Sequence, residues 1–165
     1  MPSTYCVVVD TREQVPLPAI SHLPLTSTRG TVTTAKIEWV RRPLETGDYA
    51  LLGHEQGHVF ERKAGLSELH GNLLTADRDR FVRELERSKH LKRLTLLVEA
   101  DPVAMSSAPS YNRTINPYQV RDALLRLTLA YNHLDFWMVS SKTANQRRLL
   151  AEWVVAALIH SAEGA

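Results

Sequence analysis

Short hydrophobic runs alternate along the chain with charged and turn-forming stretches. The run 7–9 is three valines followed at once by charged residues, which predicts a buried strand that ends at Asp10. The apolar run 49–52 is followed by the polar, glycine-containing stretch 53–58, which predicts a turn. The stretch 59–63 then predicts the returning strand, so the middle of the chain is expected to form a β-hairpin.

Helical spacing of apolar residues appears in the next part of the chain. A helix is predicted from Arg80 to Lys92, because apolar residues recur there at the spacing of a helical turn and charged residues fill the other face. A strand is expected over 94–99. A second helix is predicted to begin at Asn116 and Pro117, since proline suits the first helical position.

The C-terminal part is predicted to form a strand over 136–139 and a helix from Thr143 onward. That helix carries a broad apolar stripe, formed by Leu149, Leu150, Trp153, Val154, Ala157 and Leu158. Two interpretations of the stripe stay open: it packs into the core, or it also contacts a partner subunit.

Two segments rich in proline, serine and threonine, 16–31 and 101–116, are predicted to be surface loops. The second contains Tyr111 and Arg113, an aromatic residue near a cation, a combination that can stack on or hold a DNA end. An ordinary loop is the simpler interpretation of this segment.

Composition limits the possible classes of protein. The 165 residues, 44% of them hydrophobic, suit one globular domain over 1–165 with a hydrophobic core. A net charge of +2 argues against a strongly basic surface for nucleic acid, although local Arg and Lys can still bind phosphates. The sequence lacks a signal-peptide pattern and an apolar run near the roughly 20 residues that span a bilayer, so a cytosolic or nuclear location is expected.

Cysteine and histidine point away from a zinc site. Cys6 is the only cysteine, which excludes an intramolecular disulfide, and its place in the first strand predicts a small core residue. His54 and His58 stand in the predicted turn without a cysteine or a third histidine at ligand spacing, so both are expected to be solvent-exposed.

Candidate chemistry lies in the predicted hairpin. In a strand, side chains two apart share a face, so Glu61 and Lys63 are expected to project together, opposite Arg62. Asp48 begins the preceding strand, and two carboxylates there can bind Mg²⁺ or Mn²⁺, hard cations that prefer oxygen ligands. The competing interpretation is an exposed edge strand whose charges only keep the protein soluble.

Three motifs follow one another along the chain. They are Asp-x-Arg-Glu after the first strand, Gly-Asp-Tyr, and a Glu-Arg-Lys triplet that precedes an acid, a leucine and a glycine. The residues concerned are Asp10, Arg12 and Glu13; Gly47, Asp48 and Tyr49; and Glu61, Arg62 and Lys63 with Glu68, Leu69 and Gly71. This order resembles the nuclease domain of the XPF/Mus81/Hef family, also called the ERCC4 domain. The resemblance continues through Arg80 and Phe81 and covers nearly the whole chain.

The acid after the triplet departs from the family pattern. Four residues separate Lys63 from Glu68, where the family has three, and the family's acid is an aspartate. Glutamate reaches about one methylene further, so Glu68 can still bind the metal or a water that the metal holds.

The resemblance implies a restriction-endonuclease-like α/β fold, with a central mixed β-sheet flanked by α-helices. It also implies a Mg²⁺- or Mn²⁺-dependent DNA endonuclease. The expected catalytic residues are Asp10, Arg12, Asp48, Glu61, Arg62 and Lys63. The expected metal ligands are Asp48, Glu61, Glu68 and Asp10. The expected substrate contacts are Glu13, Arg78, Arg80 and Arg113.

The resemblance implies partners as well. DNA with a flap, a fork or another branch is the expected substrate, a homodimer through the C-terminal helical region is the expected assembly, and no membrane partner is expected. The helix-hairpin-helix and helicase domains that relatives carry are not expected here. Two alternatives stay open: a catalytically silent subunit that binds DNA or pairs with an active nuclease, and a sequence-specific restriction enzyme or RNA nuclease.

Overall fold

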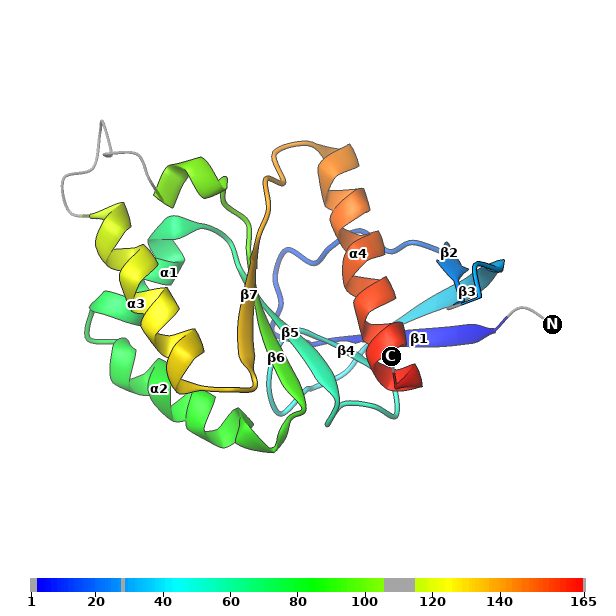
Figure 1. The fold of residues 1–165 in the computed structure, drawn as a ribbon, viewed down its shortest axis with the longest axis horizontal. Coiled ribbons are helices and arrows are strands. Elements are labelled where there is room, and N and C mark those ends of the chain that lie inside the picture. Colours follow the sequence, from blue (N-terminus) through cyan, green and yellow to red (C-terminus); the bar gives the residue numbers. More distant parts are fainter. Residues whose placement is uncertain (1–2, 28, 106–114, 165) are drawn as a thin grey trace. The chain divides into compact units, whose positions relative to one another are not determined.

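The computed structural model describes residues 3–27, 29–105 and 115–164, which form an α/β fold (Figure 1). The strands in these residues are β1 (Thr4–Val9), β2 (His22–Thr26), β3 (Val32–Arg41), β4 (Tyr49–Leu51), β5 (His58–Lys63), β6 (Arg93–Val98) and β7 (Leu134–Met138). The α-helices are α1 (Leu66–Leu74), α2 (Arg78–Arg87), α3 (Pro117–Ala130) and α4 (Ala144–Glu163). Short 3-10 helices occupy Ser88–His90 and Pro102–Met105. Parallel and antiparallel pairs both occur, so the expected mixed sheet with flanking helices is confirmed.

The chain divides into two compact units, the first made of 1–60 with 142–165 and the second of 61–141. Strand β5 contributes to both, because the first unit ends at Phe60 and the second begins at Glu61. The strand order is β2-β3-β1-β4-β5 in the first unit and β5-β6-β7 in the second. The Asp-x-Arg-Glu and Gly-Asp-Tyr motifs therefore belong to the first unit, and the Glu-Arg-Lys triplet belongs to the second.

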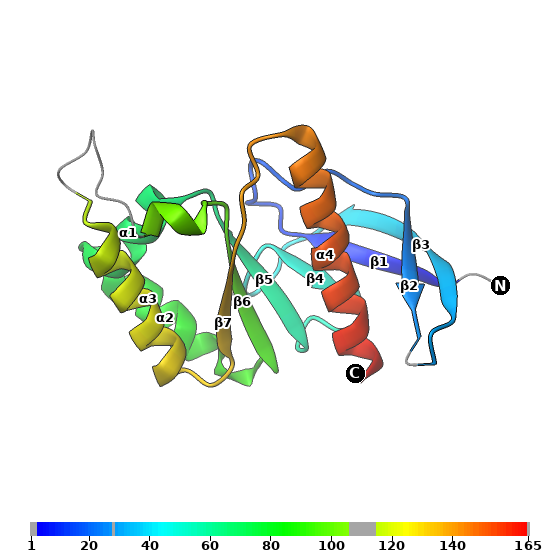
Figure 2. The same ribbon diagram turned by 45° about the horizontal axis from the view of Figure 1, so that its top comes forward.

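In the first unit, α4 packs against the strands (Figures 1 and 2). Strand β1 pairs in parallel with β3 and antiparallel with β4, and β4 pairs antiparallel with β5, with Tyr49 opposite Phe60. The three valines of β1 are buried, and so are the apolar residues that α4 turns inward. Thr143 and Gln146 form a capping box that fixes the start of α4. The Asp-x-Arg-Glu motif therefore follows directly after a buried strand.

In the second unit, three helices pack together beside a parallel strand pair (Figure 2). The β6 residues 96–98 are fully buried, and α1 contacts both α2 and α3. Helix α3 begins at Pro117, after Asn116 has accepted a hydrogen bond from the Tyr118 amide with its side chain. The residue after β6, Glu99, donates its backbone amide to the carbonyl of Lys63 at 2.9 Å. The buried strand β6 therefore supports the end of the triplet.

Most elements predicted from the sequence are confirmed. The hairpin is β4 and β5, and the helices predicted from Pro117 and from Thr143 are α3 and α4. The helix predicted over 80–92 is shorter, because α2 ends at Arg87 and a 3-10 turn follows. The strand predicted over 94–99 is β6, and the one predicted over 136–139 is β7.

The prediction of a loop over 16–31 is wrong in part, because β2 lies inside that segment. Leu23 and Leu25 are buried and alternate with exposed residues, as in a half-buried strand, but Pro24 between them is a residue that usually interrupts a sheet. Proline is tolerated here because β2 stands at the end of the strand order. Its partner β3 was not predicted, since charged and threonine residues dilute its apolar alternation.

Two predictions about single side chains also need correction. His58 is buried, with 7% of its surface exposed, and its ring stacks on Phe60 with centroids 4.5 Å apart. The reason is that His58 begins β5 and does not belong to the turn, whereas His54 lies in the turn and is exposed as expected. Cys6 is half-buried and so is not the core residue that its strand predicted.

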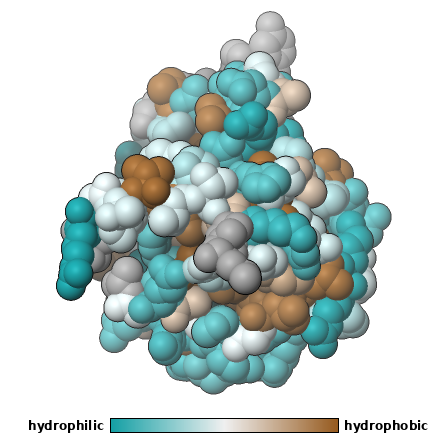
Figure 3. Space-filling view, turned by 90° about the vertical axis from the view of Figure 1, so that its right-hand side faces the viewer, coloured by the Kyte–Doolittle hydropathy of each residue, from teal (hydrophilic) through white to brown (hydrophobic). Residues whose placement is uncertain are grey.

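The apolar stripe of α4 is divided between core and surface. Leu150, Val154 and Leu158 are buried in the first unit, which confirms core packing for this part of the stripe. Leu149 and Trp153 are 45% and 70% exposed. Figure 3 shows a face on which small groups of hydrophobic residues lie among hydrophilic ones. Among the helices of the described residues, none has the length and apolar character needed to cross a membrane.

Candidate active site

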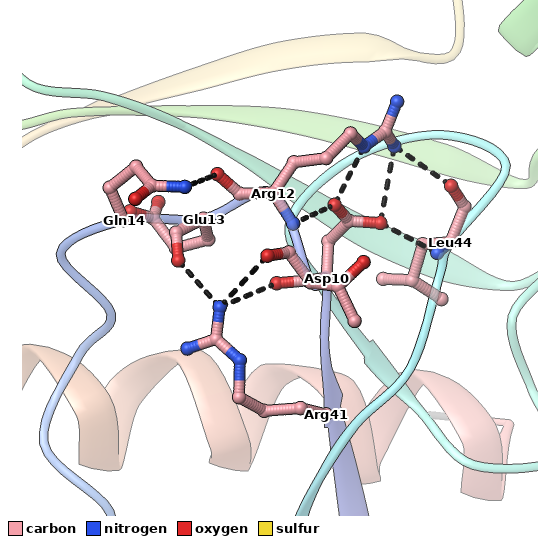
Figure 4. A network of polar contacts seen from close by, with 7 residues as sticks. Asp10, Arg12, Glu13, Gln14, Arg41 and Leu44 are labelled. Carbon is pink, nitrogen blue, oxygen red and sulfur yellow. Dashed lines mark hydrogen bonds and ion pairs between the residues drawn. The ribbon is translucent and has the colours of Figure 1, made fainter.

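Asp10 follows β1 as a fully buried carboxylate surrounded by four hydrogen bonds (Figure 4). Its Oδ1 accepts from the backbone amide and from Nε of Arg12, both at 2.7 Å. Its Oδ2 accepts from Nη2 of Arg12 at 3.1 Å and from the Leu44 amide at 2.6 Å. Burial alone would raise the pKa of Asp10, but these hydrogen bonds and the charge of Arg12 outweigh it and lower that pKa below its ordinary value. Asp10 is therefore an ionised group that joins Arg12 to the chain at Leu44.

Arg12 is held along one edge of its guanidinium. Besides its bonds to Asp10, it donates from Nη2 to the carbonyl of Leu44 at 2.9 Å. Its side chain is nevertheless 71% exposed. An arginine that is fixed in this way presents a planar cation to solvent in a defined direction, which suits recognition of a phosphate.

Arg41, the last residue of β3, contacts the backbone of the same turn (Figure 4). Its Nη2 donates to the carbonyls of Asp10, Thr11 and Glu13 at 3.3, 3.1 and 2.7 Å. The Glu13 side chain lies in the turn as well, where it accepts from the Val15 amide at 2.7 Å. Sequence reasoning missed Arg41, because an arginine in an exposed charged stretch carries no motif; only its closeness to the Gly-Asp-Tyr motif could have drawn attention to it.

The Gly-Asp-Tyr motif has a backbone reason for its glycine. Gly47 has φ of 78°, and a Cβ at this position would lie 2.2 Å from a side-chain atom of β5, so only glycine fits. The next residue, Asp48, donates its amide to the carbonyl of Phe60 at 2.7 Å and accepts from the Asp10 amide at 2.8 Å through its own carbonyl. Asp48 is half-buried, and its backbone is thus fixed on both sides within the first unit.

In the second unit, Glu61 and Lys63 share a face of β5, as predicted. Nζ of Lys63 donates to Oε1 of Glu61 at 2.8 Å. The lysine side chain is only 6% exposed, and its ammonium lies 5.3 Å from the centre of the Phe81 ring in α2. The Glu61 side chain is 25% exposed. A buried cation and a partly accessible carboxylate therefore meet at the end of this strand.

Glu68 belongs to the first turn of α1 and faces the same lysine. Its Oε1 lies 3.7 Å from Nζ of Lys63, and its Oε2 accepts from the Ala64 amide at 2.8 Å. Half of the Glu68 side chain remains covered, with 45% exposed. With its longer spacing and with glutamate in place of aspartate, the chain still brings a second carboxylate to Lys63. Three of the predicted site residues, Glu61, Lys63 and Glu68, therefore lie together in the second unit.

Arg62 points to the opposite face, as strand alternation predicted. It forms an ion pair with Glu99, and the two side chains are 10% and 5% exposed. Glu99 also accepts a hydrogen bond from the hydroxyl of Ser141. Arg62 is thus part of a buried polar network that ties β5 to the ends of β6 and β7.

A family model for the ERCC4 domain matches residues 9–153. The chain belongs to the ERCC4-domain family. The match spans all three motifs, confirms the resemblance seen in the sequence, and places the chain among the nuclease-family proteins that act on DNA. No curated protein matches this ERCC4 domain.

Two of the remaining expected substrate contacts of the ERCC4 domain, Arg78 and Arg80, belong to α2. Arg78 and Arg80 are both exposed, and Arg80 lies 3.7 Å from Asp77, a loose surface ion pair. Arg113 and Tyr111 lie outside the described residues. Within residues 3–27, 29–105 and 115–164, no group of three or more His, Cys, Asp or Glu side chains gathers at metal-binding geometry.

Proposed function

We propose that this ERCC4 domain is a metal-dependent DNA endonuclease. The observation that carries the proposal is the cluster around Lys63, in which one nearly buried ammonium faces the carboxylates of Glu61 and Glu68 at 2.8 and 3.7 Å. Burying a lysine is costly unless it is paired, so a lysine held in this way indicates a task beyond solubility. Membership of the ERCC4-domain family supports hydrolysis of phosphodiester bonds as the class of reaction.

The donor chemistry fits Mg²⁺ or Mn²⁺. Both ions prefer oxygen ligands, and Mg²⁺ takes one or two carboxylates together with water and substrate phosphate. Glu61 and Glu68, which both face Lys63 in the second unit, are the residues that we propose to hold the ion. The metal-binding role of Asp48 stays a prediction. A bound ion of this kind lowers the pKa of a coordinated water and offsets negative charge on the phosphate under attack.

The side chains of the domain then have distinct tasks. Lys63, as an ammonium, orients the attacking water and offsets negative charge at the phosphate. Arg12, which is exposed and held by Asp10, binds a flanking phosphate. Arg62 braces the strand, because it is buried against Glu99 and so is turned away from substrate. Asp10 was also expected to bind metal, and we propose a holding role for it instead, since each of its oxygens already accepts two hydrogen bonds.

The finer substrate preference is inferred from the family. We propose DNA with a flap, a fork or another branch as the substrate, contacted in addition by Arg78 and Arg80, which are exposed at the start of α2.

A homodimer through α4 stays a prediction, and the exposed pair Leu149 and Trp153, one helical turn apart, is the surface we expect it to use. Sedimentation of Trp153→Glu against the unchanged protein tests it, and equal masses at all concentrations would contradict it.

The test is cleavage of labelled single-stranded, duplex, 3′-flap and fork DNA with Mg²⁺, Mn²⁺ or EDTA. The unchanged protein is compared with Asp48→Asn and with the matched control Asp101→Asn, an exposed aspartate outside the motifs. We expect cleavage that requires the metal and falls by about 100-fold or more in Asp48→Asn only. DNA binding without cleavage in every variant and every metal would contradict the endonuclease and favour the silent subunit.

A further inference from the structure

Three backbone carbonyls of the turn after β1 converge on a single nitrogen atom. Asp10, Thr11 and Glu13 present their carbonyl oxygens to Nη2 of Arg41, at 3.3, 3.1 and 2.7 Å (Figure 4). Carbonyl oxygens carry partial negative charge, so their convergence needs a cation or a donor at the point where they meet. Arg41 is the internal cation that allows this turn to close.

The turn that Arg41 closes is the one that carries Arg12. The backbone amide of Arg12 donates to Asp10, and so does its side chain, which makes the direction of the guanidinium depend on the path of the backbone from residue 10 to residue 12. The Glu13 amide also donates to the Asp10 carbonyl, at 3.2 Å, so the same carbonyl is shared between the turn and Arg41. A shift of this backbone would turn Arg12 away from its present direction.

We propose that Arg41 is a positioning residue, which fixes the turn 10–13 and thereby holds Arg12 in the direction in which it binds a DNA phosphate. The phosphate part of this inference rests on the proposed function. Arg41 directs Nη2 into the backbone of the protein, so it acts on the substrate through Arg12. A surface arginine that only attracted DNA by its charge would contribute independently of Arg12.

The chain offers a matched control in the neighbouring residue. Arg42 is exposed like Arg41 and carries the same charge, and its backbone amide donates to the Val9 carbonyl at 3.1 Å, a bond that a change of side chain retains. Replacing Arg42 by alanine removes one positive charge beside the turn and leaves the three carbonyls with their donor.

The first measurement is a double-mutant cycle on DNA affinity. Binding of a fluorescent duplex is followed by anisotropy in EDTA, for Arg12→Ala, Arg41→Ala, the double variant and Arg42→Ala. We expect Arg12→Ala and Arg41→Ala each to weaken binding by roughly tenfold and the double variant to be no weaker than Arg12→Ala, because the two residues act as one unit. Arg42→Ala should lose no more than about threefold. Losses that multiply in the double variant would overturn the inference.

The second measurement reads the position of Arg12 without DNA. In the unchanged protein the Nε proton of Arg12 is bonded to the buried Asp10, so its hydrogen exchange is expected to be slow, and roughly tenfold faster in Arg41→Ala. Arg41→Lys keeps a cation that can donate to carbonyls, and slow exchange should return in it. An unchanged exchange rate in Arg41→Ala contradicts the inference, whatever the DNA result.

The two measurements separate this inference from the proposed function. If the unchanged protein binds no DNA, the proposed function fails, while the exchange of the Arg12 Nε proton still decides whether Arg41 positions Arg12. Thermal unfolding of each variant checks that the fold is kept. If Arg41→Ala does not fold, Arg41→Met, which keeps the aliphatic stem and removes the donors, takes its place in both tests: faster Arg12 exchange and weaker DNA binding with the fold intact support the role, and unchanged exchange overturns it.

Discussion

Two lysine–glutamate pairs with the same spacing stand on strands of this protein, and they differ mainly in burial. Lys36 and Glu38 of β3 are in contact at 2.7 Å, with 55% and 52% of their side chains exposed. Lys63 and Glu61 of β5 are in contact at 2.8 Å, with 6% and 25% exposed. Exposed pairs of this kind contribute about 0 to 1 kcal/mol to stability, because water and salt screen them. The pair on β5 is held out of water, and a second carboxylate, Glu68, faces its lysine.

The comparison teaches that the local pattern of charges says little about their task. Strand alternation brings the charged residues together in both pairs. The surroundings then decide between a solvated surface pair and a candidate active site, and these surroundings come from α1 and α2, which contribute Glu68 and Phe81 beside Lys63.

The largest effect on stability is expected at the other buried pair of the second unit. Arg62→Met leaves Glu99 buried without its cation, which should lower the free energy of unfolding by about 3–5 kcal/mol. The control is Arg93→Met, whose ion pair with Asp135 is on the surface and should cost less than about 1 kcal/mol. Urea unfolding of both variants measures the difference, and equal losses would remove the distinction between buried and exposed pairs.

A smaller loss is expected at Asp10. The asparagine of Asp10→Asn has an NH2 group where the carboxylate has an acceptor oxygen, so donors of Arg12 and Leu44 lose their acceptor. We therefore expect the free energy of unfolding to fall by about 1–3 kcal/mol at pH 7. Because the pKa of Asp10 is lowered in the folded protein, the stability it contributes is fully present above the unfolded value of about 3.9 and is lost as pH falls through the folded value.

The pH dependence gives this prediction its own check. Stability of the unchanged protein should decrease more steeply than that of Asp10→Asn as the pH is lowered below about 4, so the two curves approach each other there. Parallel curves over this range would show that Asp10 does not titrate as the structure indicates. The exposed Asp101→Asn is the control, which should follow the unchanged protein.

The aromatic ring of Phe81 is expected to contribute about 1 kcal/mol to the interaction that holds the ammonium of Lys63. Phe81→Leu keeps a large hydrophobic side chain in the core but removes the ring face 5.3 Å from Nζ. We expect cleavage to slow by about three- to tenfold, with little change in DNA affinity. A cleavage rate equal to that of the unchanged protein would show that the carboxylates alone hold the lysine.

The smallest of these effects is expected at His133, a half-buried histidine whose Nε2 lies 2.9 Å from the hydroxyl of Ser88. Burial, and then the charges of Lys89 and His90, lower its pKa. The unfolded chain therefore binds the proton more readily, and stability that is present above about pH 6.5 is lost as the pH falls below it. His133→Gln should show a flatter dependence in thermal unfolding between pH 5 and about 7. A slope equal to that of the unchanged protein would assign the pH dependence to other groups.

Much of the fold could be predicted because the buried strands and the long helices carry strong hydrophobic periods. This periodicity predicted strand β1, the hairpin, and helices α3 and α4 with the residues at which they begin. Strands β2 and β3 were not, since a proline interrupts the first and charged and threonine residues dilute the second. His58 was misplaced because a single residue decided whether it belonged to the turn or to the strand.

The candidate site was predictable only in the residues that belong to motifs. Alternation placed Glu61 with Lys63 and turned Arg62 to the other face, and the structure confirms both placements. The partners that come from distant elements, Phe81 beneath the lysine and Arg41 behind the turn, could not be read from spacing. Their positions depend on how helices and strands pack, which a local pattern does not contain.

The most direct test of the central claim is the cleavage rate of Lys63→Met set beside that of Lys36→Met, with flap DNA and Mn²⁺. Both changes remove one lysine from a strand pair of the same spacing, and thermal unfolding verifies that both variants remain folded. We expect Lys63→Met to lose about 100-fold or more in rate and Lys36→Met to retain the rate of the unchanged protein. Equal rates in the two folded variants would contradict the account, because burial and the second carboxylate would then confer no catalytic role on Lys63.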